Sequence, residues 1–261
     1  MIDHLHFISK EKLEKLYSKR NGETKLGQTV ELIQSPEALA ETRAPYVLLG
    51  VEEDIGIKAN LGIPGASKAW KEFLRAFLNL QSNQYLPGAQ VAVIGSLRFP
   101  GEMRQAEKLQ ADNERDLSAF RDLTKNIDER VYVTVKELFR LNKTPIIIGG
   151  GHNNAYPIIR AYAEHYQRRL SVVNIDPHTD YRQLEGRHSG NGFRYARKEG
   201  YLDRYAVFGL HENYNAQDIL TEFKEDAGLH YTSFEELLLF TDEERSQQWL
   251  NLLHWLGTDA P

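Results

Sequence analysis

The chain has 261 residues, of which 41% are hydrophobic and 26% charged, as in an ordinary soluble globular protein. Its net charge of −5 argues against an unspecific nucleic-acid binder, and the lack of cysteine excludes disulfides, thiolate metal sites and cysteine nucleophiles. Neither a signal peptide nor a run of roughly 20 apolar residues is recognisable, so we expect a cytoplasmic protein that does not cross a membrane.

Short apolar runs alternate with helical patterns along the chain. We expect buried strands at 45–54, 89–97, 144–152, 170–178 and 205–213, and a short sixth strand followed by a helix within LHYTSFEELL (229–238). Helices are expected at 8–20, with Ser9 as the cap, and at 68–80, 102–142, 155–167 and 242–256. Apolar strands that alternate with helices predict an α/β fold with a mostly parallel sheet covered on both faces. Since no repeat or linker interrupts this pattern, we predict a single domain, 1–261.

The most chemically reactive side chains follow the predicted strands directly. They lie in the segments EED (52–54), GGGHNN (149–154), DPHTD (176–180) and HEN (211–213). In open parallel sheets, ligands bind beyond the carboxyl ends of the strands. The sequence therefore predicts that these segments meet at one rim and form a site there.

The segment SVVNIDPHTDYR contains three potential metal ligands at alternate positions. In an extended chain, Asp176, His178 and Asp180 would face the same side, and Pro177 would end the strand pairing. Two carboxylates and an imidazole suit Mn²⁺, with Zn²⁺, Fe²⁺ or Co²⁺ less favoured. The alternative is a polar strand end in which the histidine is hydrogen-bonded to a carboxylate.

The segment GGGHNN follows another predicted strand. Its glycines permit a tight turn, which would bring His152 to the same rim as a fourth ligand. A glycine-rich turn between a strand and a helix can also bind a phosphate, but this one matches neither the dinucleotide nor the P-loop pattern.

These segments, together with SGN at 189–191, resemble the ureohydrolase superfamily of arginase, agmatinase and formimidoylglutamase. The resemblance implies a three-layer α/β/α fold and a binuclear Mn²⁺ site that hydrolyses a C–N bond of a guanidino or formimino group. It assigns His152 and Asp180 to one ion, His178 to the other, and Asp176 to a bridge between them. Two such ions would supply hydroxide near neutral pH.

The resemblance also implies a set of substrate contacts, namely Arg182, Ser189, Asn191, Glu212 and Asn213. Phe193 replaces the proton-transferring histidine of arginases, so SGNGFR is closer to the formimidoylglutamase pattern. His188 is then the candidate for proton transfer. Gly151 replaces the aspartate that precedes the ligand histidine in the family, which could loosen the imidazole.

The last metal motif of the family, with two further aspartates, is not found before the chain stops at GTDAP. In the family topology the corresponding strands lie in the middle of the sheet. Their absence would leave the strands at 144–152 and 170–178 unpaired along one edge. We therefore expect the sequence to be a fragment of a longer enzyme, truncated at its C-terminus, rather than a degenerate relative.

Three functional hypotheses remain open. The first is a ureohydrolase acting on N-formimidoyl-L-glutamate, with arginine or agmatine as alternative substrates, and it predicts a small-molecule substrate and a possible homo-oligomer. Arg182, Arg187 and Arg194 favour a substrate with an anionic tail. The second is a non-catalytic relative that keeps part of the metal site. The third is an unrelated α/β protein whose glycine-rich turn binds an anion.

Overall fold

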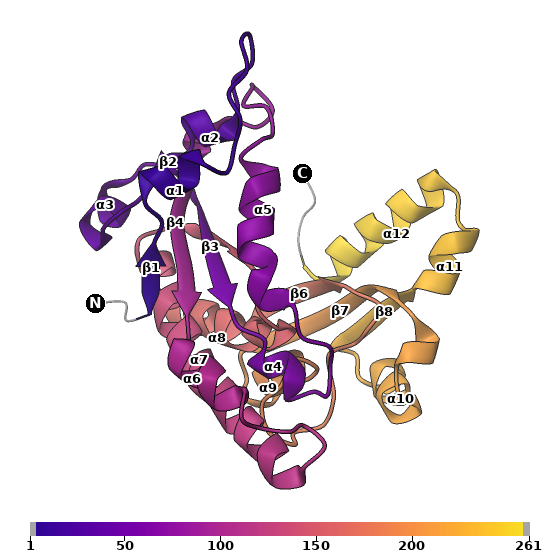
Figure 1. Ribbon diagram of the computed structural model, residues 1–261. Helices are drawn as coiled ribbons and strands as arrows, with labels where there is room; N and C mark the ends of the chain where they lie inside the picture. Colours follow the sequence, from indigo (N-terminus) through magenta and orange to yellow (C-terminus); the bar gives the residue numbers. More distant parts are fainter. Residues whose placement is uncertain (1–3, 258–261) are drawn as a thin grey trace. The chain divides into compact units, whose positions relative to one another are not determined.

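The computed structural model describes residues 4–257, which form two compact units (Figure 1). Unit 1 consists of the chain up to Ala161 together with Gly186–Ser189. Unit 2 consists of Tyr162–Glu185 together with the chain from Gly190 onward. Both units combine parallel strands with helices, which confirms the predicted α/β class. The single domain over 1–261 stays a prediction.

Unit 1 contains a five-stranded sheet in the order β1-β4-β3-β5, with β2 also paired to β4. Only β1 is antiparallel to its neighbour. The strands are β1 (Leu5–Phe7), β2 (Glu31–Leu32), β3 (Tyr46–Glu52), β4 (Val91–Arg98) and β5 (Thr144–Ile148). The helices are α1 (Lys10–Glu14), α2 (Leu26–Thr29), α3 (Pro36–Glu41), α4 (Ile55–Lys58), α5 (Ala69–Phe77), α6 (Pro100–Ala106), α7 (Glu114–Arg140) and α8 (Ala155–Tyr166), the last of which continues into unit 2.

Unit 2 contains a three-stranded parallel sheet in the order β6-β7-β8. Its strands are β6 (Leu170–Ile175), β7 (Leu202–Leu210) and β8 (Leu229–Ser233). Its helices are α9 (Gly192–Lys198), α10 (Gln217–Glu225), α11 (Phe234–Leu239) and α12 (Asp242–Trp255). Leu252 and Leu256 pack against Ala206 of β7, so α12 covers one face of this sheet.

The helical predictions were less accurate than the strand predictions. The expected helix 102–142 is two helices, because the Asn113 side chain accepts hydrogen bonds from the amides of Arg115 and Asp116 and so begins α7. The expected helix 8–20 is only the short α1. Its predicted cap is confirmed, since the Ser9 hydroxyl oxygen accepts a hydrogen bond of 3.4 Å from the Lys12 amide.

Two apolar strands have an open edge. Among the described residues, β5 pairs only with β3, and β6 pairs only with β7. In agreement with this, Ile146 of β5 is 38% exposed and Ile175 of β6 is 72% exposed.

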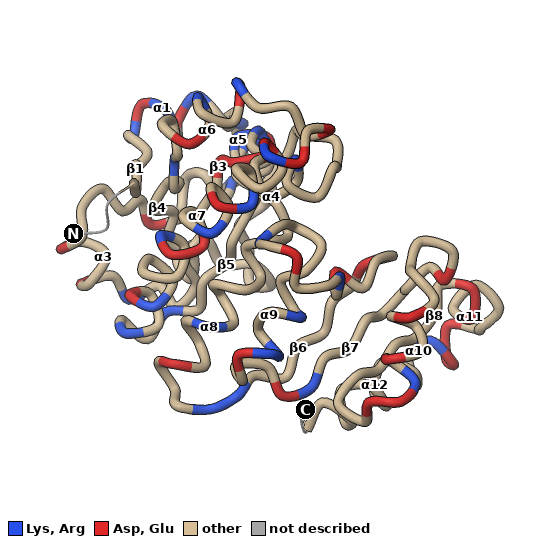
Figure 2. Tube along the Cα trace, turned by 90° about the horizontal axis from the view of Figure 1, so that it is seen from below, with Lys and Arg blue, Asp and Glu red and all other residues tan. Residues whose placement is uncertain are grey.

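The charged side chains are distributed over both units. Basic and acidic positions are interspersed along the trace in Figure 2, including along α7. In the described part of the chain, no helix has both the length and the apolar character needed to cross a bilayer.

Candidate metal centre

The loop after β6 carries the three ligands predicted from SVVNIDPHTDYR, all within unit 2. Carboxylate oxygens of Asp176 and Asp180 approach to within 4.8 Å of each other. The predicted extended conformation is wrong, however, because β6 ends at Ile175 and Asp180 has a φ of +43°. The two carboxylates thus come together through a turn with a left-handed residue, which asparagine and aspartate tolerate better than most side chains.

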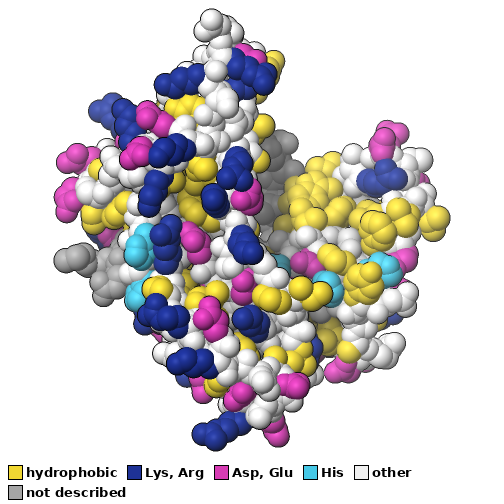
Figure 3. Space-filling view, viewed as in Figure 1, with side chains coloured by type: hydrophobic (Ala, Val, Ile, Leu, Met, Phe, Trp, Pro, Cys, Tyr) yellow, Lys and Arg dark blue, Asp and Glu magenta, His cyan; other side chains and the backbone are white. Residues whose placement is uncertain are grey.

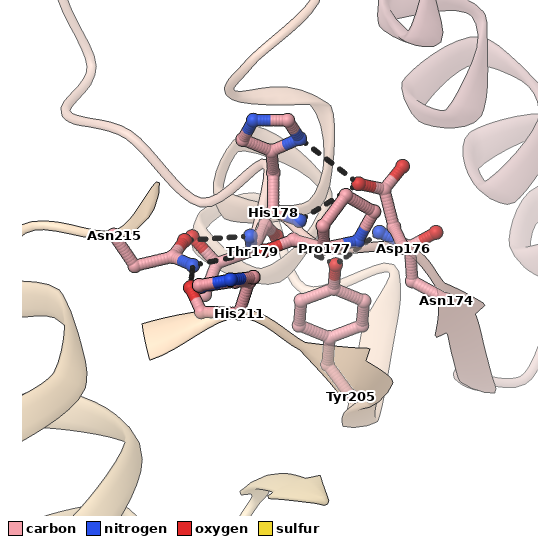
Figure 4. Close-up of polar contacts among 8 residues, drawn as sticks. All are labelled: Asn174, Asp176, Pro177, His178, Thr179, Tyr205, His211 and Asn215. Carbon is pink, nitrogen blue, oxygen red and sulfur yellow. Dashed lines mark hydrogen bonds and ion pairs between the residues drawn. The ribbon is translucent and has the colours of Figure 1, made fainter. Parts of the chain in front are cut away.

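Tyr205 of β7 holds this loop from inside unit 2. Its hydroxyl donates a hydrogen bond of 2.6 Å to the Thr179 carbonyl and accepts one of 3.2 Å from Nδ2 of the Asn174 side chain (Figure 4). The Tyr205 ring is completely buried. Burial raises the pKa of Tyr205 well above its usual value, and the nearby Asp180 and Asp176 raise it further. Tyr205 therefore stays protonated and remains a donor.

Asn215 holds the loop from its other side. Its side-chain oxygen accepts a 2.8 Å hydrogen bond from the Thr179 amide, and its side-chain nitrogen donates to the Pro177 carbonyl at 3.1 Å. The His211 amide donates to the same Pro177 carbonyl at 3.0 Å. All these bonds use backbone atoms of the loop. A candidate ligand also holds the loop, because Asp176 Oδ1 accepts a 2.8 Å hydrogen bond from the His178 amide.

His178 lies at the exposed end of the loop. Its Nδ1 is 3.1 Å from Oδ1 of Asp176, and its ring stacks on Tyr214, with the ring centroids 5.4 Å apart. The side chain of His178 is 54% exposed and that of Asp176 is 23% exposed, so both are accessible. The hydrogen bond of the alternative interpretation is thus present. Two carboxylates and an accessible imidazole nevertheless fit Mn²⁺, which prefers oxygen and nitrogen ligands.

His152 begins the short 3₁₀ helix His152–Asn154 in unit 1, directly after β5. The turn before it requires glycine, because Gly149 and Gly150 have φ values of +86° and +71°. This confirms the turn predicted from GGGHNN.

Glu53 fixes the His152 turn. Its Oε1 accepts hydrogen bonds from the Gly151 amide at 2.7 Å and from Asn154 Nδ2 at 3.3 Å, and its Oε2 accepts from the amides of Ile55 and Gly56 at 2.7 and 3.1 Å. The side chain is completely buried. A carboxylate directly after β3 thus anchors the segment that contains Gly151.

Arg187 is buried in unit 1 beside Asp128 of α7. Its Nε lies 2.8 Å from Asp128 Oδ2, and it donates a 3.0 Å hydrogen bond to the Asn153 carbonyl. Arg187 therefore has a structural partner, and its contribution to an anionic substrate site stays a prediction. The neighbouring His188 is completely buried, and its role in proton transfer stays a prediction.

The substrate contacts predicted around SGN have different environments. Arg182 is exposed and forms a 3.1 Å ion pair with Glu185, whereas Arg194 forms two bonds with Glu222. Asn191 is completely buried, and its amide donates to the Gln183 carbonyl at 3.2 Å. Arg194 thus holds α9 to α10, and its contact with a substrate tail stays a prediction.

Ser189 and the residues after β7 complete the predicted set. The Ser189 amide donates to the Gly56 carbonyl at 2.9 Å within unit 1. Glu212 and Asn213 have exposed side chains in the short 3₁₀ helix Glu212–Tyr214 of unit 2. Their contacts with a substrate remain predictions.

Comparison of the sequence with models of known protein families shows the family to which the chain belongs. A model of the arginase family matches residues 44–248. The chain belongs to the arginase family. This confirms the resemblance inferred from the motifs.

Curated relatives of this arginase-family chain include formimidoylglutamases. It is 28% identical over 190 residues to the enzyme of Chromobacterium violaceum. The aligned region covers 70% of this chain and 54% of the relative. It is also 28% identical over 221 residues to that of a Geobacillus strain, covering 83% and 61%. The chain thus spans little more than half the length of these relatives.

Solved structures share the arginase-family fold with this chain. The formimidoylglutamase of Bacillus subtilis matches with a TM-score of 0.67 and 16% identity, covering 91% of this chain and 68% of that one. The Mn²⁺-containing formiminoglutamase of Trypanosoma cruzi matches with a TM-score of 0.62 and 20% identity, covering 91% and 72%. At these identities the matches support the fold alone.

Three residues with a clear role in this arginase-family site were not predicted from sequence, namely Glu53, Tyr205 and Asn215. The segment EED (52–54) was expected at the rim, but no contact was predicted for Glu53, which accepts a hydrogen bond from the amide of Gly151, 98 positions away. The segment HEN (211–213) indicated the loop in which Asn215 lies, but the predicted contacts were Glu212 and Asn213.

Proposed function

We propose that the protein hydrolyses a C–N bond of a linear amidine, with N-formimidoyl-L-glutamate as substrate and Mn²⁺ as cofactor. The observation that carries the proposal is the preformed loop after β6, in which the carboxylates of Asp176 and Asp180 converge within 4.8 Å. The formimidoylglutamases among the curated relatives support the substrate class.

His152 and Asp180 would hold one Mn²⁺, His178 would hold the second, and Asp176 would bridge the two. When bound, such ions lower the pKa of water, which supplies hydroxide near neutral pH, and they stabilise the charge that develops on the substrate. The contribution of the chain itself is to hold the ligands in place. Tyr205 and Asn215 fix the loop that carries three of them, and Glu53 fixes the turn that carries His152.

The substrate would lie against residues of the SGN segment and the loop after β7. We assign its carboxylates to Arg182, whose exposed ion pair with Glu185 is a weak one to displace. Ser189, Asn191, Glu212 and Asn213 would provide further polar contacts. Addition of water to the formimidoyl carbon and cleavage of its bond to the glutamate nitrogen would give formamide and glutamate.

Glutamate release by the Mn²⁺-loaded protein tests this proposal. We expect glutamate from N-formimidoyl-L-glutamate, no urea from arginine or agmatine, and complete loss of activity with EDTA. Asp176→Asn should lower activity by at least about 100-fold, because the bridging carboxylate is lost. Asp242→Asn, at a fully exposed side chain, is the matched control and should change activity less than twofold.

The other outcomes are equally informative. Urea release from arginine or agmatine would move the substrate assignment to those compounds. Mn²⁺ binding without turnover of any of the three would overturn the catalytic proposal in favour of a non-catalytic relative.

A further inference from the structure

Unit 1 contains a cavity of about 720 Å³ on the face of its sheet that carries α1 and α5. It does not include any of the candidate metal ligands. Its size is that of a pocket for a small molecule. Its lining includes Lys12 of α1, Glu52 of β3, and Trp70, Lys71 and Leu74 of α5.

The cavity exists because β3 and β4 carry small residues at facing positions. Gly50 of β3 pairs in register with Ser96 of β4, and a Cβ on Gly50 would lie 2.4 Å from the Trp70 ring. Trp70 of α5 therefore lies over Gly50, and Leu48, Val93 and Ile148 of the neighbouring sheet positions pack into the same cluster. Gly95, with φ of +122°, leaves room for the His6 carbonyl of β1 in the same way.

The floor of the cavity is apolar. A short polar network lies at one end of the cavity, at the carboxyl ends of β3 and β4. Trp70 and Leu74 are 4% and 1% exposed and belong to the core of unit 1. At the ends of β3 and β4, Arg98 Nε lies 3.2 Å from Glu52, which also accepts a hydrogen bond from the Ser96 hydroxyl. The cavity thus offers apolar surface beneath a charged rim.

The rim is strongly basic, although the whole chain has a net charge of −5. Five of the lining side chains are cationic and only one is acidic; the cations are Lys12, Lys15, Lys71, Arg75 and Arg98. Figure 3 shows Lys and Arg side chains around a hydrophobic patch on the face with α1, β1 and α5. Cations gathered in a concave site create a local positive potential.

Two of these cations are available to a ligand. In the described part of the chain, no carboxylate lies within ion-pair distance of the Lys12 or Lys71 ammonium group, whereas Lys15, Arg75 and Arg98 each have one. Lys15 and Arg75 pair with Glu11 and Glu72 across highly exposed contacts, which are weak and easily exchanged.

We propose that this cavity binds an anionic small molecule that combines an oxyanion group, phosphate, sulfonate or carboxylate, with an apolar body of about the size of an aromatic ring system. The oxyanion would contact Lys12 and Lys71, and the apolar part would lie over Trp70 and Leu74. This site is independent of the proposed hydrolase activity, because it shares no residue with the metal centre.

Binding of 8-anilinonaphthalene-1-sulfonate, an aromatic sulfonate, tests the site. The experiment uses a chain with Trp249→Phe and Trp255→Phe, so that Trp70 is the remaining tryptophan. We expect energy transfer from excited Trp70 to the bound probe, which quenches Trp70 emission and produces probe emission. Binding should weaken at higher salt. Lys12→Glu with Lys71→Glu should weaken binding by roughly tenfold or more, since two attractive charges become repulsive.

The matched control reverses two exposed lysines outside the cavity, Lys108→Glu with Lys125→Glu, and should change the affinity less than twofold. Equal affinity of the two double variants would overturn the proposal, as would probe binding that leaves Trp70 emission unchanged. Circular dichroism of both variants establishes that they are folded.

Discussion

Replacing Arg187 with methionine is expected to lower the free energy of unfolding by about 3–5 kcal/mol at pH 8. The side chains of Arg187 and Asp128 are only 5% and 1% exposed, so methionine leaves a buried carboxylate without its cation. Urea denaturation followed by circular dichroism measures the loss. Arg182→Met, at a half-exposed arginine with a surface ion pair, is the control and should cost less than about 1 kcal/mol.

The loss caused by Arg187→Met should become smaller as the pH falls from 8 to 5. Burial raises the pKa of Asp128 to about 7, the charge of Arg187 opposes this rise, and Glu53 adds to it. In the unfolded chain the pKa of an aspartate is near 4. Between these values the folded protein binds a proton that the unfolded chain does not, so this group's contribution to stability falls as the pH rises through that window.

Without Arg187 the folded pKa of Asp128 should rise further, and a neutral Asp128 at pH 5 no longer needs a cation. The variant is therefore closest to the wild type at acid pH. An equal loss at pH 5 and pH 8 would contradict this account of the buried pair.

The second large effect is expected from Glu53→Gln, with a loss of about 2–4 kcal/mol in the free energy of unfolding. The glutamine amide group would face two buried donors, either Gly151 N and Asn154 Nδ2 or the amides of Ile55 and Gly56, and charge-assisted bonds are lost on both sides. Chemical denaturation measures the loss. Glu52→Gln, at the partly exposed neighbouring residue, is the control and should cost less than about 1 kcal/mol.

Glu53→Gln should also change hydrogen exchange near the His152 turn. Because Glu53 fixes the Gly151 amide, its loss should speed hydrogen exchange at Gly151 by at least about tenfold while the centre of β4 stays protected. The pKa of Asp128 should fall at the same time, since a like charge that raises it is removed. Unchanged exchange at Gly151 would show that the carboxylate does not anchor the His152 turn.

The strands could be predicted because each is a short, nearly continuous apolar run between helical patterns. The segments expected at 45–54 and 89–97 correspond to β3 and β4 within a few residues. β1 and β2, with three and two residues, are too short to show any periodicity. The break between α6 and α7 carried a signal, the capping Asn113, that hydrophobic periodicity alone does not detect.

The residue types of the candidate site could be predicted, but not the contacts that hold them. The spacing of Asp176 and Asp180 indicated a common direction through an extended chain, whereas their approach depends on a left-handed residue held by Tyr205 and Asn215. Arg187 looked like a substrate contact because its partner, Asp128, lies 59 positions away. Such long-range partners leave no local pattern in one sequence.

The central claim is that His152 and Asp180 bind the same Mn²⁺ ion, and calorimetric titration of four proteins with Mn²⁺ tests it most directly. These are the wild type, His152→Ala, Asp180→Asn and the double variant, in which asparagine tolerates the left-handed conformation. We predict that each single substitution weakens Mn²⁺ binding by at least about tenfold and that the double variant loses at least about 1 kcal/mol less than the sum of the single losses. Losses that add, or unchanged Mn²⁺ affinity in His152→Ala, would contradict a shared site.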